Sequence, residues 1–126
     1  MAKEKFQVEH TIKSSHKILF NRLSTAGGLN EWFADNVSVQ GKIFTFDWSG
    51  TEQKAEMINK KDMKYVRFHW LDDDDEKSYF EFKINVDELT GDIALIITDF
   101  AEPDEIEDAK ELWETQVQEL KHVIGL

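Results

Sequence analysis

A change in hydrophobic spacing divides this chain, and it limits the possible folds more than any other feature. Between residues 36 and 100, bulky apolar residues recur at every second position, which is the spacing of strands with one buried face. Residues 104–124 instead place apolar side chains three and four positions apart, as an amphipathic helix does. Many consecutive strands closed by one apolar helical face favour a curved antiparallel sheet wrapped on a long C-terminal helix. We therefore predict an α+β fold, and such a shape can enclose a cavity.

The N-terminal part predicts one strand followed by two short helices. Hydroxyl side chains at residues 14–15 and again at 24–25 can accept hydrogen bonds from free N–H groups at helix starts. Trp32 and Phe33 then belong to the apolar face of the second short helix. The connections between strands are only a few residues long, so we expect neighbouring strands to pair as hairpins. The sheet has about seven expected strands: 5–12, 36–40, 43–49, 52–60, 64–71, 77–86 and 92–100.

The composition fits one globular domain over residues 1–126. Hydrophobic residues make up 40% of the chain and charged residues 33%, and the net charge is −11. Because a domain this acidic repels phosphate groups, we expect neither nucleic acid nor a membrane as a partner. The chain has no cysteine, which excludes disulfides and thiolate chemistry. Its first ten residues, MAKEKFQVEH, lack the apolar stretch of a signal peptide, and we expect a cytoplasmic location.

The two faces of the predicted sheet differ in polarity. One row is apolar, and the other carries mixed charges, among which Arg67 and Glu81 are expected to pair across neighbouring strands. Strand 92–100 is apolar on both sides, which leaves the side of Asp99 undecided. If no helix covers its residues Ile93, Leu95 and Ile97, they form an exposed patch, and we predict a homodimer or protein contact there.

No arrangement of residues typical of catalysis or metal binding occurs in the sequence. The histidines do not stand at a metal-binding spacing, and there is neither a nucleophile motif nor a phosphate-binding loop. The acidic run Asp72–Glu76 lacks the glycine-containing pattern of a calcium loop and predicts a solvated hairpin tip. We therefore expect no catalytic residue, no metal and no cofactor.

The order of strand, two short helices, six strands and long helix resembles the helix-grip fold of the START-like (SRPBCC) superfamily. Within it, the chain is similar to bacterial START-like domains close to the activator-of-Hsp-ninety-ATPase-like family. The matching stretches are LSTAGGLNEWFAD (23–35), FTFDW (44–48), YVRFHW (65–70), SYFEFKINVDELTGD (78–92), ITDFAE (97–102) and LWETQVQEL (112–120).

The resemblance implies a cavity between the sheet and the C-terminal helix, suited to a small apolar molecule that is lipid-like or aromatic. Non-catalytic binding of such a ligand is the leading prediction. A protein-interaction module of the co-chaperone type is the alternative, and a cyclase- or hydrolase-like enzyme is a further one. Because large aromatic side chains also pack as ordinary core, the cavity can equally be filled. The residues implied to line it are Trp32, Phe44, Phe46, Trp48, Met57, Phe68, Trp70, Phe80, Phe82, Trp113 and Val117.

Overall fold

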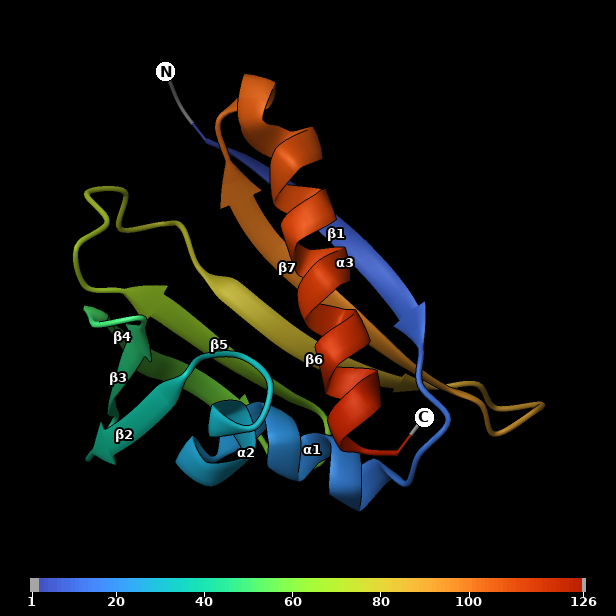
Figure 1. Cartoon of the computed structure of the whole chain (residues 1–126). Helices are drawn as coiled ribbons and strands as arrows, with labels where there is room; N and C mark the ends of the chain where they lie inside the picture. Colours follow the sequence, from blue (N-terminus) through green and yellow to red (C-terminus); the bar gives the residue numbers. More distant parts are fainter. Residues whose placement is uncertain (1–2, 126) are drawn as a thin grey trace.

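The computed structural model describes residues 3–125. Within these residues, one seven-stranded antiparallel sheet is combined with two short helices and a long C-terminal helix (Figure 1), which confirms the predicted α+β helix-grip fold. The strands are β1 (Glu4–Thr11), β2 (Asn36–Gln40), β3 (Ile43–Trp48), β4 (Thr51–Lys61), β5 (Tyr65–Trp70), β6 (Phe80–Val86) and β7 (Ile93–Ala101). The helices are α1 (His16–Ser24), α2 (Ala26–Asn30) and α3 (Ile106–Val123), and the 3-10 turn η1 (Pro103–Glu105) precedes α3.

The strands follow one another as hairpins, except that β1 pairs with the last strand. The order across the sheet is β1-β7-β6-β5-β4-β3-β2. Helix α3 lies along the part of the sheet that β1, β7 and β6 form, and α1 and α2 lie at one end of the molecule (Figure 1). Helix α3 therefore covers the part of the sheet near β1 and β7. Strands β4, β3 and β2 stand at the opposite end of the strand order.

Two hydroxyl groups begin the short helices, as the sequence predicts. The Ser15 Oγ accepts a hydrogen bond from the Ile18 N–H at 3.0 Å, and the Thr25 Oγ1 accepts one from the Gly28 N–H at 2.9 Å. A Cβ atom at Gly28 would lie 2.2 Å from the Asn21 backbone oxygen. Glycine is therefore required where α2 folds back onto α1. Helix α2 ends at Asn30, so Trp32 and Phe33 lie in the turn that follows it.

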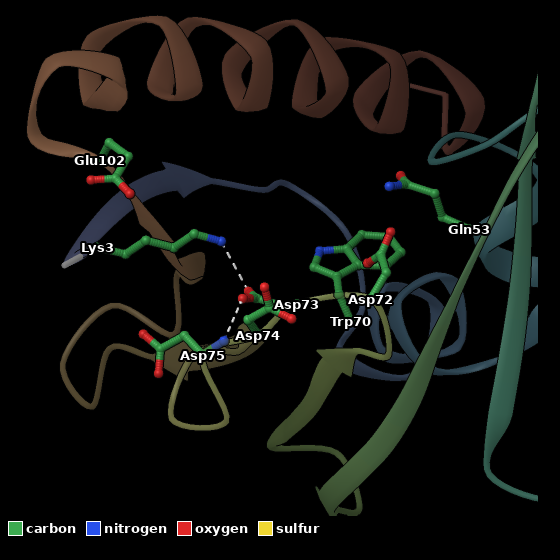
Figure 2. Close-up of a pocket in the computed structure, with 8 residues that line it drawn as sticks. All are labelled: Lys3, Gln53, Trp70, Asp72, Asp73, Asp74, Asp75 and Glu102. Atoms are coloured by element: carbon green, nitrogen blue, oxygen red, sulfur yellow. Dashed lines mark hydrogen bonds and ion pairs between the residues drawn. The ribbon is translucent and has the colours of Figure 1, made fainter. Parts of the chain in front are cut away.

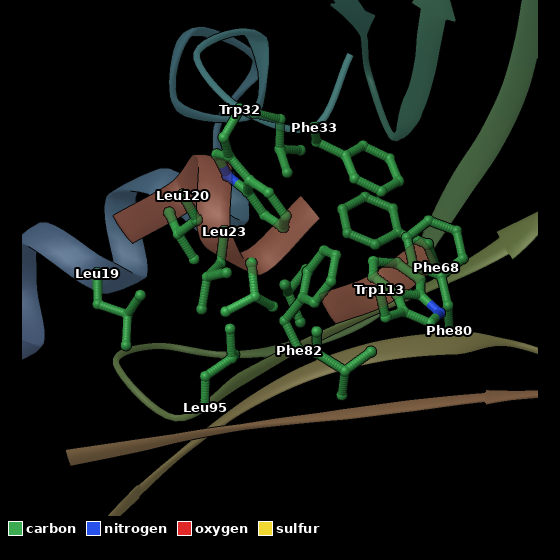
Figure 3. Packing of buried hydrophobic residues seen from close by; sticks show 14 of the residues in the cluster. Leu19, Leu23, Trp32, Phe33, Phe68, Phe80, Phe82, Leu95, Trp113 and Leu120 are labelled. Carbon is green, nitrogen blue, oxygen red and sulfur yellow. The ribbon is translucent and has the colours of Figure 1, made fainter. Parts of the chain in front are cut away.

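Aromatic side chains fill most of the space between the sheet and α3. Phe68 stacks on Phe80 with ring centroids 5.0 Å apart, and Phe82 meets Trp113 of α3 edge to face at 5.7 Å (Figure 3). The buried positions of α3 are Trp113, Val117 and Leu120, which lie three and four residues apart. This confirms that the apolar stripe of the helix faces the apolar row of the sheet.

The prediction of an exposed apolar patch on β7 is wrong. Leu95 and Ile97 have 0% exposure, because their row faces α3 and the core, and Ile93 is half-buried at the edge of the same cluster. On the charged face, the Arg67 Nη2 lies 2.8 Å from the Glu81 Oε2, directly across β5 and β6, as predicted.

Candidate ligand-binding cleft

A cleft of about 400 Å³ remains open where the aromatic core reaches the N-terminal half of α3. It lies between α3 and the ends of β3, β5 and β7. Three tryptophans line it: Trp48 and Trp70 belong to the sheet, and Trp113 belongs to α3. Its lining residues are Phe33, Trp48, Gln53, Trp70, Asp99, Ala109, Leu112, Trp113 and Gln116.

The aromatic walls hold one another in place. Phe33 stacks on Trp113 with centroids 5.8 Å apart and contacts Trp48 edge to face at 5.4 Å. Trp48 in turn lies 6.1 Å from Trp70. The indole N–H of Trp48 donates to the Phe33 backbone oxygen at 2.8 Å, so its hydrogen-bonding group is already used inside the protein. The cleft consequently has rigid apolar walls.

A tight turn fixes Trp48 at the end of β3. Ser49 and Gly50 both have positive φ values, of 53° and 89°, as a two-residue hairpin turn requires. The Asp47 Oδ1 accepts from the Gly50 N–H at 2.7 Å, and the Asp35 Oδ2 accepts from the Ser49 N–H at 2.8 Å. Asp47, which the sequence shows as an isolated charge in a strand, therefore stabilises the turn.

Asp99 is the one ionisable side chain among the residues that line the cleft. It stands on the same row of β7 as Leu95 and Ile97, so its carboxyl group points toward α3. The Oδ2 accepts a hydrogen bond from the Trp113 indole N–H at 2.9 Å, and the Oδ1 accepts from the Phe100 N–H at 2.8 Å. Burial raises the pKa of Asp99 above its ordinary value, while these two hydrogen bonds act in the opposite direction. The carboxyl group thus joins the helix to the sheet at the floor of the cleft.

An acidic groove of about 880 Å³ adjoins the cleft and shares Trp70 and Gln53 with it. Its other lining residues are Lys3, Asp72–Asp75 and Glu102 (Figure 2). The loop of this groove is only partly the solvated tip that the sequence predicts. Asp73 accepts hydrogen bonds from Ser78, from the Asp75 N–H and from Lys3, and the Lys3 Nζ lies 3.0 Å away. Burial raises the pKa of Asp73, but these hydrogen bonds outweigh it and bring the pKa to about 2.

The structure brings only some of the predicted cavity residues to the cleft. Trp48, Trp70 and Trp113 line it. Trp32 has 5% exposure and donates its indole N–H to the Arg22 backbone oxygen at 2.8 Å, away from the cleft. Met57 is half-buried at the edge of the core, next to a bulge in β4. The remaining predicted residues are buried in the packed core: Phe44, Phe46, Phe68, Phe80, Phe82 and Val117.

Sequence reasoning missed several lining residues. Asp99 lies on the apolar row, two residues from Ile97, but a strand that is apolar on both sides does not show which row faces the core. Ala109, Leu112 and Gln116 of α3 also line the cleft. Their spacing of three and four residues places them on one face of the helix beside Trp113, and this spacing could have predicted them from the sequence. Gln53 carries no such signal, because it is a polar residue on a largely exposed strand.

Neither a metal site nor a membrane-spanning helix is found in the described part of the chain. Over residues 3–125, no three side chains of the ligating types gather closely enough to hold a metal ion. No helix within this range has the length and apolar character needed to cross a bilayer.

The comparisons with known proteins agree with this architecture. The model of the START-like superfamily domain matches residues 1–126. The solution structure of BfR322 from Bacteroides fragilis is 44% identical, with a TM-score of 0.71, over 100% of this chain and 94% of that chain. No match was found among curated proteins.

Two further solved structures share the fold at lower identity. The Aha1 dimer from Colwellia psychrerythraea is 18% identical, with a TM-score of 0.78 over 94% of this chain and 93% of that chain. Protein MLL2253 from Mesorhizobium loti is 19% identical, with a TM-score of 0.75 over 96% of each chain. At these identities the two likenesses establish the fold alone. With the family match spanning the sheet, the short helices and α3, the chain belongs to the START-like superfamily.

Proposed function

We propose that the cleft binds a small apolar molecule, aromatic or lipid-like, without chemically changing it. The observation that carries this proposal is the open volume of about 400 Å³ walled by Trp48, Trp70 and Trp113. The rest of the same helix–sheet interface is filled by buried aromatic and aliphatic side chains. A cleft of this size with mostly apolar walls and three polar side chains, Gln53, Asp99 and Gln116, has the character of a small-molecule site.

The expected affinity is weak. Burying about 200 Å² of apolar ligand surface contributes about 5 kcal/mol at about 25 cal/mol per Å². The loss of ligand freedom on binding offsets part of this gain. A ligand of one or two rings should therefore bind with a Kd in the range of about 0.2 mM to 10 mM.

Binding without turnover is favoured over a cyclase- or hydrolase-like reaction by the make-up of the cleft. General acid–base chemistry needs a titratable group within hydrogen-bond reach of the substrate. Asp99 is such a group, but it is the one ionisable side chain among the lining residues, so no second titratable group lies beside it there to act as its acid or base partner. Its role in the proposal is that of a polar anchor beside the apolar walls.

A variant that fills the cleft tests the proposal. Ala109 lines the cleft from α3, and Ala109→Phe would occupy the space in which a ligand would lie. Thr115→Phe makes a comparable change on an exposed position of the same helix, outside the cleft, and is the matched control. Indole is a suitable probe, titrated by proton–nitrogen correlation NMR of the tryptophan side chains.

We expect indole to shift the side-chain signals of Trp48, Trp70 and Trp113 in the wild type and in Thr115→Phe. In Ala109→Phe these shifts should be lost while the fold is kept. Equal shifts in both variants, or no shift in the wild type, would contradict the proposal.

A protein contact of the co-chaperone type, or a homodimer, is the second candidate function. The support is the shared fold with a protein described as the Aha1 dimer. The contact would not use Leu95 and Ile97, since these are buried. Sedimentation that gives the mass of one chain across micromolar concentrations would contradict the homodimer. We place either function in the bacterial cytoplasm, which the cysteine-free composition and the bacterial sources of the relatives support.

A further inference from the structure

We propose that the ligand of the cleft is an organic cation, with an ammonium group facing the Asp99 carboxylate and an apolar group between the tryptophans. This inference rests on the proposed function and names the chemical class of the ligand. It is argued from the charges and ring positions around the cleft.

The Asp99 carboxylate lies in the cleft without a cation at ion-pair distance, and Lys3 acts on it only from farther away. Its hydrogen bonds come from two uncharged donors, the Trp113 indole and the Phe100 backbone N–H. Among residues 3–125, no lysine, arginine or histidine lies within ion-pair distance of it. A carboxylate offers about four acceptor positions, so about two remain open to a ligand. A buried charge of this kind is costly unless it is paired, and a bound cation would supply the partner.

The walls of the cleft favour a positive group for a second, independent reason. The negative face of an indole ring attracts ammonium groups, and tryptophan does so more strongly than the other aromatic residues. Here Trp48, Trp70 and Trp113 line one space. The N–H groups of Trp48 and Trp113 are bonded within the protein, so neither is free to donate to an anionic ligand.

An anionic ligand, such as a fatty acid, finds no counter-charge in the cleft. None of the lining residues is lysine, arginine or histidine. The nearest candidate in the adjoining groove, Lys3, is held by Asp73 at 3.0 Å. A ligand carboxylate would lie near Asp99 and be repelled by it.

The electrostatic field around the cleft also favours a cationic ligand. The chain carries a net charge of −11, and the groove that shares Trp70 with the cleft is lined by Asp72–Asp75 and Glu102. Such a field raises the local concentration of cations and their rate of association, to a degree that falls with added salt. The groove is a source of attraction here, while the binding groups are those of the cleft.

A charge series of similar size tests the inference: benzylamine is a cation at neutral pH, benzyl alcohol is neutral, and benzoate is an anion. Each is titrated into the whole protein and followed by the side-chain NMR signals of the cleft tryptophans, with Trp32 as an internal reference. We expect benzylamine to bind about fivefold to thirtyfold more tightly than benzyl alcohol, which is the size of a favourable cation–ring contact. We expect benzoate to bind more weakly than both.

The variant Asp99→Asn keeps the size of the side chain and an acceptor for Trp113 but removes the charge. It should lower the affinity for benzylamine about fivefold or more beyond any change that it causes in the affinity for benzyl alcohol. Asp92→Asn, in the exposed β6–β7 turn, makes the same change in net charge away from the cleft and should change neither.

The outcomes separate the two proposals. If benzyl alcohol and indole bind in the cleft but benzylamine binds no more tightly than the alcohol, the cation inference is wrong and the proposed function stands. If none of the neutral or charged probes moves the tryptophan signals, both are wrong. Because the comparison of probes on the wild type needs no variant, a folding defect of Asp99→Asn would not hide the result.

Discussion

Removing the indole N–H of Trp113 tests how α3 is fixed to the sheet. In Trp113→Phe the Asp99 carboxylate loses a donor at 2.9 Å, and a hydrogen bond to a charged group contributes about 1.5–3 kcal/mol. The smaller ring leaves a space of about 40 Å³ in the core, which costs about 1 kcal/mol more. We expect the free energy of unfolding to fall by about 3 kcal/mol, measured by urea unfolding with circular dichroism.

A double-mutant cycle with Asp99→Asn separates the hydrogen bond from the change in packing. The two substitutions share one contact, so the coupling energy should be about 1–2 kcal/mol. Trp32→Phe is the matched control, because Trp32 is equally buried but donates to the Arg22 backbone oxygen. Its effect should simply add to that of Asp99→Asn. Additive effects of Trp113→Phe and Asp99→Asn, within about 0.5 kcal/mol, would refute the reasoning.

The loss of stability in Trp113→Phe should depend on pH, because the pKa of Asp99 differs between the folded and the unfolded protein. Burial raises the pKa of Asp99 in the folded protein, so the ionised carboxyl group costs stability above that pKa, and the cost disappears as the pH falls through it. Loss of the Trp113 donor removes a contact that holds the pKa down, and raises it further. The destabilisation by Trp113→Phe should therefore be largest at neutral pH and become smaller in acid.

Two further predictions concern the elements around the cleft. Gly28→Ala should destabilise the protein by about 2 kcal/mol or more in thermal unfolding, because its Cβ would lie 2.2 Å from the Asn21 oxygen. Gly27→Ala is the control, because a Cβ there meets no atom within 4 Å, and it should be neutral or slightly stabilising. Asp73 has a folded-state pKa of about 2, below its ordinary value of 3.8. Its contribution to the free energy of unfolding is therefore present above about pH 4 and is lost as the pH falls toward 2. Asp73→Asn should lose about 1 kcal/mol at neutral pH, after allowance for solvent screening, and show a weaker decline over that acid range; an unchanged decline would contradict this.

The sequence predicted the fold because its signals are local and consistent. Alternation in β3 and β5, hydroxyl caps at Ser15 and Thr25, and the spacing of Trp113 and Val117 each specify one element without knowledge of the rest. The Arg67–Glu81 pair was also predictable, since both residues lie on the charged rows of strands that follow one another in the chain.

The site was less predictable, because it depends on how side chains share space. Phe44, Phe68 and Trp48 have the same alternating pattern, yet only Trp48 reaches the cleft, while the two phenylalanines contact each other at 5.2 Å in the core. The burial of Leu95 could not be decided from a strand that is apolar on both sides. It required the position of α3, which residues distant in sequence determine together.

The most direct test of the central claim is an intermolecular NOE experiment with indole bound to the whole protein. The account predicts NOEs between indole protons and the ring protons of Trp48, Trp70 and Trp113, and none to Trp32. NOEs confined to Trp32, or to residues outside the space between α3 and the sheet, would contradict it.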